Sequence, residues 1–377
     1  MKIIRLLIVG IFFTSANLFA QIPTGYYDGT ADLTGAALKT KLSTIITNGH
    51  KDMGYGSGTG GLWTAYYTTD VDNYYEKDGT VLDMYSENPA PNTTGIPNDA
   101  YQYKLGQVTA GGNQCGNGTN NENSCYNREH SLPKSYFGGK NATPMANDAH
   151  FVIPTDYYVN NQRGNLFYGE TNAAPSFTNG TKIGTSSFPG YSGTVFEPID
   201  EFKGDLARMW LYFITRYETK LIGFYNINTA TSPFDGSTHN GYQQWIINLL
   251  LKWHVKDPVS KREIDRNNAV NKFQGNRNPF IDHPEYVNQI WNSTLSTTET
   301  QLQSFSIYPN PVTNNLLLVN GKDLQNIKKI EIFNISGAKV QTIKAPFTKG
   351  NSIKLNNLSK GVYILKTENN SQKFIVE

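Results

Sequence analysis

Charged residues are scarce in this chain of 377 residues: Asp, Glu, Lys and Arg make up only 17%, and the formal net charge at pH 7 is +2. This balance excludes a protein that attracts polyanions through its overall charge, so attraction for nucleic acid would have to come from a local patch. Long apolar runs are scarce as well. Beyond the N-terminus no stretch is apolar enough to cross a bilayer, so we expect no membrane span in the mature chain.

The first 20 residues hold the one notable apolar run. Lys2 and Arg5 precede apolar residues from Leu6 to Phe13, and small residues then lead to Ala20. This pattern is typical of a secretory signal peptide and is too short for a membrane span. We therefore expect residues 1–20 to be a signal peptide and the mature protein to be soluble and exported.

Cysteine is nearly absent, with only Cys115 and Cys125 present. Two cysteines alone rarely make a metal site. Because they follow a signal peptide, we expect them to reach an oxidising compartment and to form a structural disulfide. The bridge would close a short loop rich in Gly and Asn that ends three residues before Arg128.

Length and composition predict more than one domain. With 38% hydrophobic residues, the chain can build cores for two or three domains. A segment rich in Ser, Thr and Gln at 293–303 predicts a linker between a first domain at 21–292 and a second at 304–377. In the first domain, apolar residues recur at helical spacing over 204–217 and 245–253. Trp210 and Trp253 lie on these apolar faces, which favours a core role over stacking on nucleobases.

One stretch combines residues that suit hydrolytic chemistry. Glu129 and His130 are adjacent, and Asn160 follows about thirty residues later. A hard divalent cation takes oxygen ligands such as the Glu129 carboxylate and the Asn160 amide. A neutral imidazole such as that of His130 can take a proton from the attacking water. The stretch therefore predicts a metal-dependent phosphodiesterase.

The same stretch predicts its own local fold. An apolar run at 149–153, ended by Pro154, is typical of a buried strand. Thr155 can cap the helix that follows and Gly164 can end it. If Glu129 and His130 end an earlier strand, the unit is strand, loop, strand and helix, with the metal between the first strand and the helix.

Four short motifs carry a family resemblance: Arg-Glu-His at 128–130, Asp-x-His at 148–150, Val-Asn-x-x-Arg-x-Asn at 159–165 and Gln-Gly-Asn-Arg-Asn-Pro-Phe at 274–280. In this order they resemble the endonuclease I family of secreted bacterial nucleases, a branch of the ββα-metal (His-Me finger) nucleases. The resemblance implies an α+β fold, with a ββα-metal finger nuclease domain that carries additional helices and loops. It also implies a largely sequence-nonspecific endonuclease that acts on DNA, with RNA as a further substrate.

The resemblance and the chemistry together assign roles. His130 is the expected general base, and Glu129 and Asn160 are the expected ligands of one Mg²⁺ ion, with Mn²⁺ or Ca²⁺ as alternatives. Arg163 is the second predicted catalytic residue, and two roles stay open for it. Its guanidinium either contacts phosphate or fastens the helix to the first strand.

Five further residues are predicted to support the site: Arg128, Asp148, His150, Asn165 and Arg277. Asp148 and His150 are expected behind the metal ligands rather than on the metal itself, and Asn165 is expected to secure the loop after the helix. Arg277 is expected to contact phosphate or to support the active site.

The chain departs from the family pattern in one place. Some relatives have an arginine between the first two motifs that is thought to stabilise the transition state. Residues 131–147 contain no arginine, only Lys134 and Lys140. A lysine can supply a point charge but not a bidentate fork, so this role stays open.

Residues 252–283 hold seven positive and four negative side chains. They could follow a phosphate backbone, but a solvated helix surface with ion pairs is the favoured interpretation.

The C-terminal 74 residues differ in pattern. Alternating runs at 329–333 and 362–365 predict a small antiparallel β-sandwich. Tyr-Pro-Asn-Pro at 308–311 and the step at 361–363 resemble the sorting domain of the type IX (Por) secretion system. This resemblance implies the type IX machinery as a partner, with release from the cell or attachment to its surface. A carbohydrate-binding or adhesive module is the rival interpretation.

Two functional hypotheses remain. The first is a secreted, monomeric, metal-dependent endonuclease whose partner is its nucleic-acid substrate. The second is a non-catalytic, nucleic-acid-binding or adhesive cell-surface protein that keeps the nuclease fold.

Overall fold

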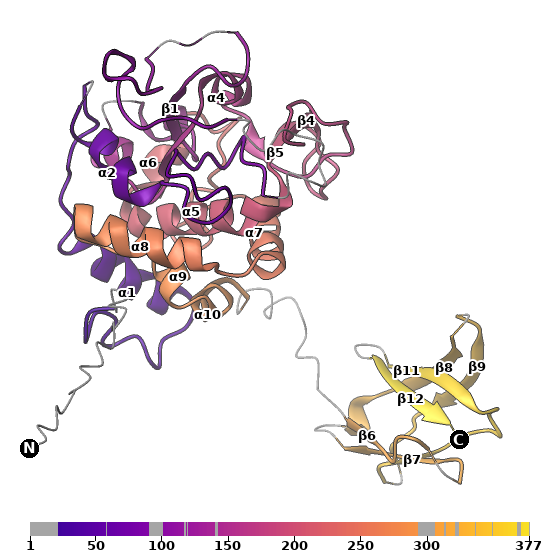
Figure 1. Cartoon of the computed structure of the whole chain (residues 1–377). Helices are drawn as coiled ribbons and strands as arrows, with labels where there is room; N and C mark the ends of the chain where they lie inside the picture. The colour runs from indigo at the N-terminus through magenta and orange to yellow at the C-terminus, as the bar shows by residue number, and fades with distance from the viewer. Residues whose placement is uncertain are drawn as a thin grey trace, which may run out of the picture. The chain divides into compact units, whose positions relative to one another are not determined.

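A computed structural model describes residues 22–292 and 306–376, apart from 58, 90–100, 117, 119, 140–141, 313, 321–323, 336, 349 and 368–370. The predicted signal peptide (1–20), the whole of the predicted linker (293–303) and Lys140 lie outside the described residues. The chain divides into two compact units, Met1–Asn292 and Ser293–Glu377 (Figure 1).

The first unit mixes helices with short strands. Its helices are α1 (Gly35–Thr47), α2 (Leu62–Thr69), α4 (Tyr157–Arg163), α5 (Lys203–Arg216), α6 (Leu221–Tyr225), α7 (Gln244–Lys256), α8 (Lys261–Gln274), α9 (Pro279–Asp282) and α10 (Glu285–Val287). Its strands are β1 (Tyr126–His130), β2 (Val152–Asp156), β3 (Phe167–Tyr168), β4 (Lys182–Thr185) and β5 (Thr194–Glu197). β1 and β2 form one sheet, and β3, β5 and β4 form another in that order. The predicted α+β class is therefore confirmed.

Helix α5 is the centre of the first unit. Every one of its residues is buried, and the helix packs against α1 and α7 in the middle of the fold (Figure 1). Trp210 on α5 and Trp253 on α7 are 1% and 0% exposed. The prediction that both tryptophans belong to the core is confirmed, and both are too deeply buried to stack on a nucleobase.

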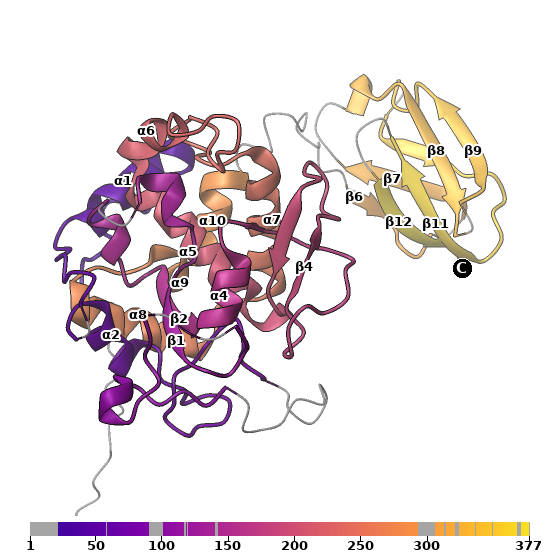
Figure 2. The same ribbon diagram turned by 90° about the horizontal axis from the view of Figure 1, so that it is seen from above.

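The predicted sequence of strand, loop, strand and helix is present. β1 and β2 pair antiparallel with Glu129 opposite Ile153, and α4 begins directly after β2 and packs on both strands (Figure 2). The second strand begins later than the predicted 149–153, because the amides of Phe151 and Val152 bond back to the Asp148 carbonyl in a turn. Pro154 is tolerated inside β2 because a two-stranded sheet leaves one side of each strand unpaired.

The cap of α4 differs from the prediction. Asp156, not Thr155, is the N-cap, and its carboxylate accepts the Val159 amide at 2.8 Å. Thr155 is fully buried within β2. Gly164 ends the helix with φ of 53°, as predicted, in the left-handed region that favours glycine.

The second unit consists of two antiparallel sheets. Its strands are β6 (Ser306–Tyr308), β7 (Leu316–Asn320), β8 (Lys329–Asn334), β9 (Lys339–Lys344), β10 (Ser352–Lys354), β11 (Gly361–Lys366) and β12 (Ser371–Val376). The sheets have the orders β10-β7-β6 and β12-β11-β8-β9. Leu317 and Val319 from the first sheet join Ile330, Leu365 and Phe374 from the second in one core, as in a β-sandwich. Within the part of the chain that the structure describes, no helix has the length and apolar character to span a membrane.

Candidate active site

A cavity of about 280 Å³ opens where β1 meets α4. Glu129 and His130 from β1 line it together with Asn160 and Arg163 from α4. The cavity wall also includes Arg128, Lys134, Asn165 and Tyr55. The structure thus brings into one cavity an acid, an amide and an imidazole that are up to 31 positions apart in the sequence.

One carboxylate oxygen of Glu129 accepts hydrogen bonds from the protein, and the other is left open, with no hydrogen bond from the described residues. Its Oε1 accepts the Tyr85 hydroxyl at 2.9 Å and Arg163 Nη1 at 2.5 Å, while among the described residues no donor is bonded to Oε2. The residue is only 4% exposed, and this burial raises the pKa of the Glu129 carboxyl, although Arg163 and Tyr85 act in the opposite direction. A cation beside Oε2 would favour the ionised carboxylate.

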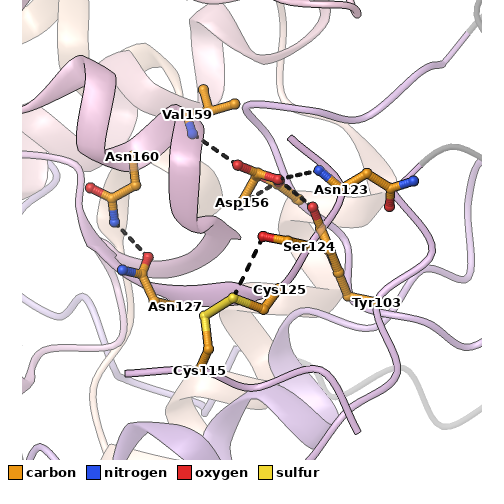
Figure 3. The surroundings of a disulfide bond; sticks show 10 residues. Tyr103, Cys115, Asn123, Ser124, Cys125, Asn127, Asp156, Val159 and Asn160 are labelled. Atoms are coloured by element: carbon orange, nitrogen blue, oxygen red, sulfur yellow. Dashed lines mark hydrogen bonds between the residues drawn. A yellow bond between two sulfur atoms is a disulfide. The ribbon is translucent and has the colours of Figure 1, made fainter. Parts of the chain in front are cut away.

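The side-chain amide of Asn160 is also held through one of its two polar atoms. Its Nδ2 donates to Asn127 Oδ1 at 2.8 Å and more weakly to the Arg128 carbonyl at 3.4 Å. Both acceptors belong to β1, so the amide nitrogen faces the strand and the amide oxygen points away from it (Figure 3). Asn160 Oδ1 is therefore left as a ligand atom.

His130 is held in one tautomer. Its Nε2 lies 3.1 Å from the Ala146 carbonyl, which can only accept, so Nε2 carries the proton and Nδ1 keeps its lone pair. The Ala146 carbonyl thus fixes the orientation of the ring and leaves Nδ1 as the free ring nitrogen. The Tyr55 ring stacks on the imidazole at a centroid distance of 5.9 Å. Burial, and then the charge of Lys134, lower the pKa of His130 to about 3, so the imidazole is neutral near pH 7.

Arg163 connects α4 to the end of β1. Besides Glu129, its guanidinium donates to the carbonyls of His130 at 3.1 Å and Ser131 at 2.6 Å. The side chain is fully buried, and the same Ser131 carbonyl accepts Trp210 Nε1 from α5. The contacts fasten the helix to the first strand and both to the central helix.

Two more cations border the cavity. The Arg128 guanidinium lies 3.4 Å from the centroid of the Tyr55 ring and 4.2 Å from that of Trp63, and its Nη1 donates to the carbonyls of Tyr55 and Gly56. Lys134 is exposed. Among the described residues, neither Arg128 nor Lys134 forms an ion pair with an acidic side chain, so both can contribute positive charge to the cavity.

Asp148 and His150 lie behind the site rather than in its wall. Asp148 Oδ2 accepts the hydroxyls of Tyr212 and Tyr217 and Arg216 Nη1, and Oδ1 accepts Gln274 Nε2. Burial opposes ionisation of Asp148, but the charge of Arg216, the neighbouring His150 and His50 and the hydrogen bond from Gln274 outweigh it and lower the pKa of Asp148 to about 2. His150 is bonded through Nε2 to the Asn276 carbonyl. The second and fourth motifs therefore meet in the core.

Asn165 and Arg277 occupy different surroundings. Asn165 lines the cavity, and its Oδ1 and carbonyl accept Ser135 Oγ and the Tyr136 hydroxyl, which ties the loop after α4 to the loop after β1. Arg277 does not line the cavity. Its guanidinium makes two bonds to Asp282, at 2.6 and 2.7 Å, and is 1% exposed.

The positive side chains of 252–283 are mostly paired. Lys252, Lys256 and Lys261 reach Glu170, Asp200 and Asp265 at the surface, and Arg266 is buried against Asp70. This confirms the favoured interpretation of a helix surface with ion pairs for the three lysines, whereas Arg266 belongs to a buried ion pair.

Several contributors to the site were not predicted from the sequence, namely Tyr55, Trp63, Tyr85 and Tyr168. Tyr85 reaches Glu129 from 44 positions upstream, and Tyr168 bonds the Tyr85 hydroxyl at 2.5 Å. Nothing in the local sequence around these residues distinguishes them from the other tyrosines and tryptophans of the chain. Only their contacts in the structure show that they contribute to the site.

The predicted disulfide is present between Cys115 and Cys125, and Cys115 borders the cavity (Figure 3). We expect the double variant Cys115→Ser, Cys125→Ser to lower the free energy of unfolding by about 2–3 kcal/mol, because the unfolded chain loses a cross-link over a ten-residue separation. Urea denaturation at pH 7 measures this loss. Reduced wild-type protein is the control and should match the variant; equal stability of oxidised and reduced protein would contradict the prediction.

Comparison with known proteins agrees with this architecture. Residues 34–285 match the model of the Endonuclease I family, and residues 306–377 match the secretion system C-terminal sorting domain. The chain is 32% identical over 268 residues to an extracellular ribonuclease of Bacillus subtilis, which covers 71% of this chain and 78% of the relative. It is also 27% identical over 142 residues to Endonuclease-1 of Buchnera aphidicola, over 37% of this chain and 48% of that protein.

The sorting domain marks the chain for secretion or attachment at the cell surface, with the type IX system as the export route that it implies. The match over 34–285 includes the whole of the cavity wall, with Glu129, His130 and Asn160 in it. On this evidence the chain is a nuclease that belongs to the endonuclease I family and that carries a C-terminal sorting domain.

Proposed function

We propose that the chain is a secreted, metal-dependent endonuclease that hydrolyses phosphodiester bonds of DNA and RNA with little sequence preference. One observation carries the proposal. The open oxygens of Glu129 and Asn160 and the open Nδ1 of His130 belong to residues that line the same cavity, and each is held by a bond to its other polar atom.

The donor set fits a hard cation. A carboxylate oxygen and an amide oxygen suit Mg²⁺, which keeps several water ligands and takes few protein ligands. No group of three or more His, Cys, Asp or Glu suited to a metal occurs among the described residues, which fits a site with two protein ligands and argues against a closed structural site. Mn²⁺ and Ca²⁺ prefer similar oxygen ligands. When bound, the ion would neutralise negative charge on the phosphate and on the leaving oxygen.

The protein's own side chains would accept the proton, position the carboxylate and supply positive charge to the phosphate. His130 accepts the proton of the attacking water at Nδ1, while the Ala146 carbonyl keeps the ring in the required tautomer. Arg163 is a positioning residue that holds Glu129 Oε1 and so directs Oε2 into the cavity. In place of the arginine that some relatives carry, Lys134 and Arg128 supply positive charge to the substrate phosphate.

RNA enters the proposal because two Bacillus relatives are named extracellular ribonucleases, each 32% identical to this chain. Both DNA and RNA are therefore substrates to test.

Chelation tests the proposal. We expect the purified mature protein to degrade plasmid DNA and RNA in Mg²⁺, to stop in EDTA and to recover when Mg²⁺ is restored, because the cation would neutralise charge on the leaving oxygen. Asn160→Ala should weaken Mg²⁺ binding in calorimetric titration and reduce cleavage. Asn161→Ala, an exposed neighbour on the same helix, is the matched control.

Two results would contradict the proposal. Cleavage that continues unchanged in EDTA would remove the metal from the mechanism. The absence of cleavage under all conditions would favour the non-catalytic alternative, a protein that binds nucleic acid or a surface with the same fold.

A further inference from the structure

A second cavity adjoins the candidate active site. It has a volume of about 420 Å³ and lies between the loop after β1 and the segment that follows α6. Asn165 lines both cavities, and Ser135 and Tyr136 in the second follow directly on Lys134 in the first. A nucleotide whose phosphate occupies the first cavity would therefore have a neighbouring group at the second.

The wall of this second cavity has the chemistry of a nucleobase site. Tyr136, Phe224 and Ile227 supply apolar surface, and Ile227 is 50% exposed. Tyr136 is itself supported from behind by Phe167, stacked at a centroid distance of 5.4 Å with an interplanar angle of 29°. A flat, neutral ring gains from such a surface, since stacking on an aromatic side chain is worth roughly 1–3 kcal/mol for each base.

Polar groups at the rim can read the edge of a base. Asn165 and Asn228 use their Oδ1 atoms to accept Ser135 Oγ and the Ala230 amide, and among the described residues nothing accepts from their Nδ2 atoms. Thr231 adds a hydroxyl. These donors and acceptors suit the polar edge of a base.

The charges favour a base over a phosphate. No Asp, Glu, Lys or Arg is among the described residues that line the second cavity, whereas Lys134 and Arg128 line the first. A phosphate would be drawn to the cations of the first cavity, and a neutral base to the second.

We propose that the second cavity binds one nucleobase next to the scissile phosphate. A base can enter only when it is unstacked and unpaired, which costs energy in a duplex and little in a single strand. The cavity therefore makes single-stranded nucleic acid the preferred substrate. This inference rests on the proposed function, because it places the scissile phosphate beside Glu129, His130 and Asn160.

The test uses short single-stranded oligonucleotides with one natural phosphodiester among methylphosphonate linkages, so that the cleaved bond is known. Either the base 5′ or the base 3′ of this bond is replaced by an abasic site. For the wild-type protein in Mg²⁺, we expect removal of one of these two bases to lower kcat/KM roughly 5- to 100-fold. The variants Asn228→Ala and Tyr136→Leu should cleave the intact substrate more slowly and should lose their sensitivity to the abasic site.

Controls separate the base site from other effects. Asn228 is exposed, so its variant should fold even if Tyr136→Leu does not. Tyr136→Phe keeps the ring and should keep the sensitivity to the missing base. Ile222→Ala changes a 50% exposed residue of α6 outside the cavity wall and should behave as wild type.

The outcomes are distinct. If wild type and Asn228→Ala respond equally to each abasic site, or if wild type cuts duplex as fast as single strand, the base site is excluded while the nuclease stands. If cleavage of the intact oligonucleotide survives EDTA and His130→Ala, the proposed function itself fails.

Discussion

Replacing His130 with alanine is expected to lower kcat/KM for plasmid DNA by about 10²- to 10⁴-fold, the usual contribution of a positioned general base. The loss follows from the removal of Nδ1, which the Ala146 carbonyl leaves as the open ring nitrogen. Initial rates of plasmid nicking in Mg²⁺ measure the effect, with circular dichroism and thermal unfolding as tests of the fold.

The variant His130→Gln tests whether His130 acts as a base or only through its hydrogen bond. Its amide can still bond to the Ala146 carbonyl but cannot act as a base near pH 7, so it should lose about as much activity as alanine. His283→Ala is the control, because His283 pairs with Glu285 outside the cavity wall. If His130→Ala cut DNA at the wild-type rate, the assigned base would be wrong.

Replacing Arg163 with leucine is expected to lower the free energy of unfolding by about 3–5 kcal/mol, because it leaves a buried carboxylate without its partner. Glu129 is 4% exposed, and three bonds to the end of β1 disappear with the guanidinium. Urea denaturation at pH 7 measures the change. The same variant should lose nuclease activity, since Glu129 is no longer held toward the cavity.

A second substitution separates the effect of the unpaired Glu129 charge from the other effects of losing Arg163. Glu129→Gln combined with Arg163→Leu removes the unpaired charge, so the double variant should recover part of the stability while it stays inactive. Lys252→Leu at an exposed pair with Glu170 is the control and should change stability by less than about 1 kcal/mol. A loss for Arg163→Leu as small as that of the control would show that the buried pair does not hold the site together.

Features that depend on neighbours along the chain were predicted well. The helical spacing of apolar residues over 204–217 anticipated α5 to within one residue at either end, because a buried helix needs an apolar surface whatever it packs against. The two cysteines and Gly164 were also predicted, since compartment and backbone conformation restrict these residue types strongly. The motifs around Glu129, His130 and Asn160 led to the candidate site, and all three residues line one cavity.

Errors arose where two local choices were nearly equal in energy. Thr155 and Asp156 can both cap a helix, and N-cap propensity favours Asp over Thr only slightly. The structure chooses Asp156, the last residue of β2, whose carboxylate accepts the Val159 amide and also the Asn123 amide and the Tyr103 hydroxyl (Figure 3).

The sequence by itself determined the fold class, the central helices, the disulfide and the chemical types gathered at the site, because periodicity and residue chemistry act over a few positions. Only the tertiary structure decided which oxygen of Glu129 stays open, which nitrogen of His130 holds the proton and where Asp148 points. Those choices depend on Tyr85, Ala146 and Tyr212, which reach the site from other elements. A hydrogen bond requires a partner within about 3 Å, and only the packing of the whole unit brings these partners that close.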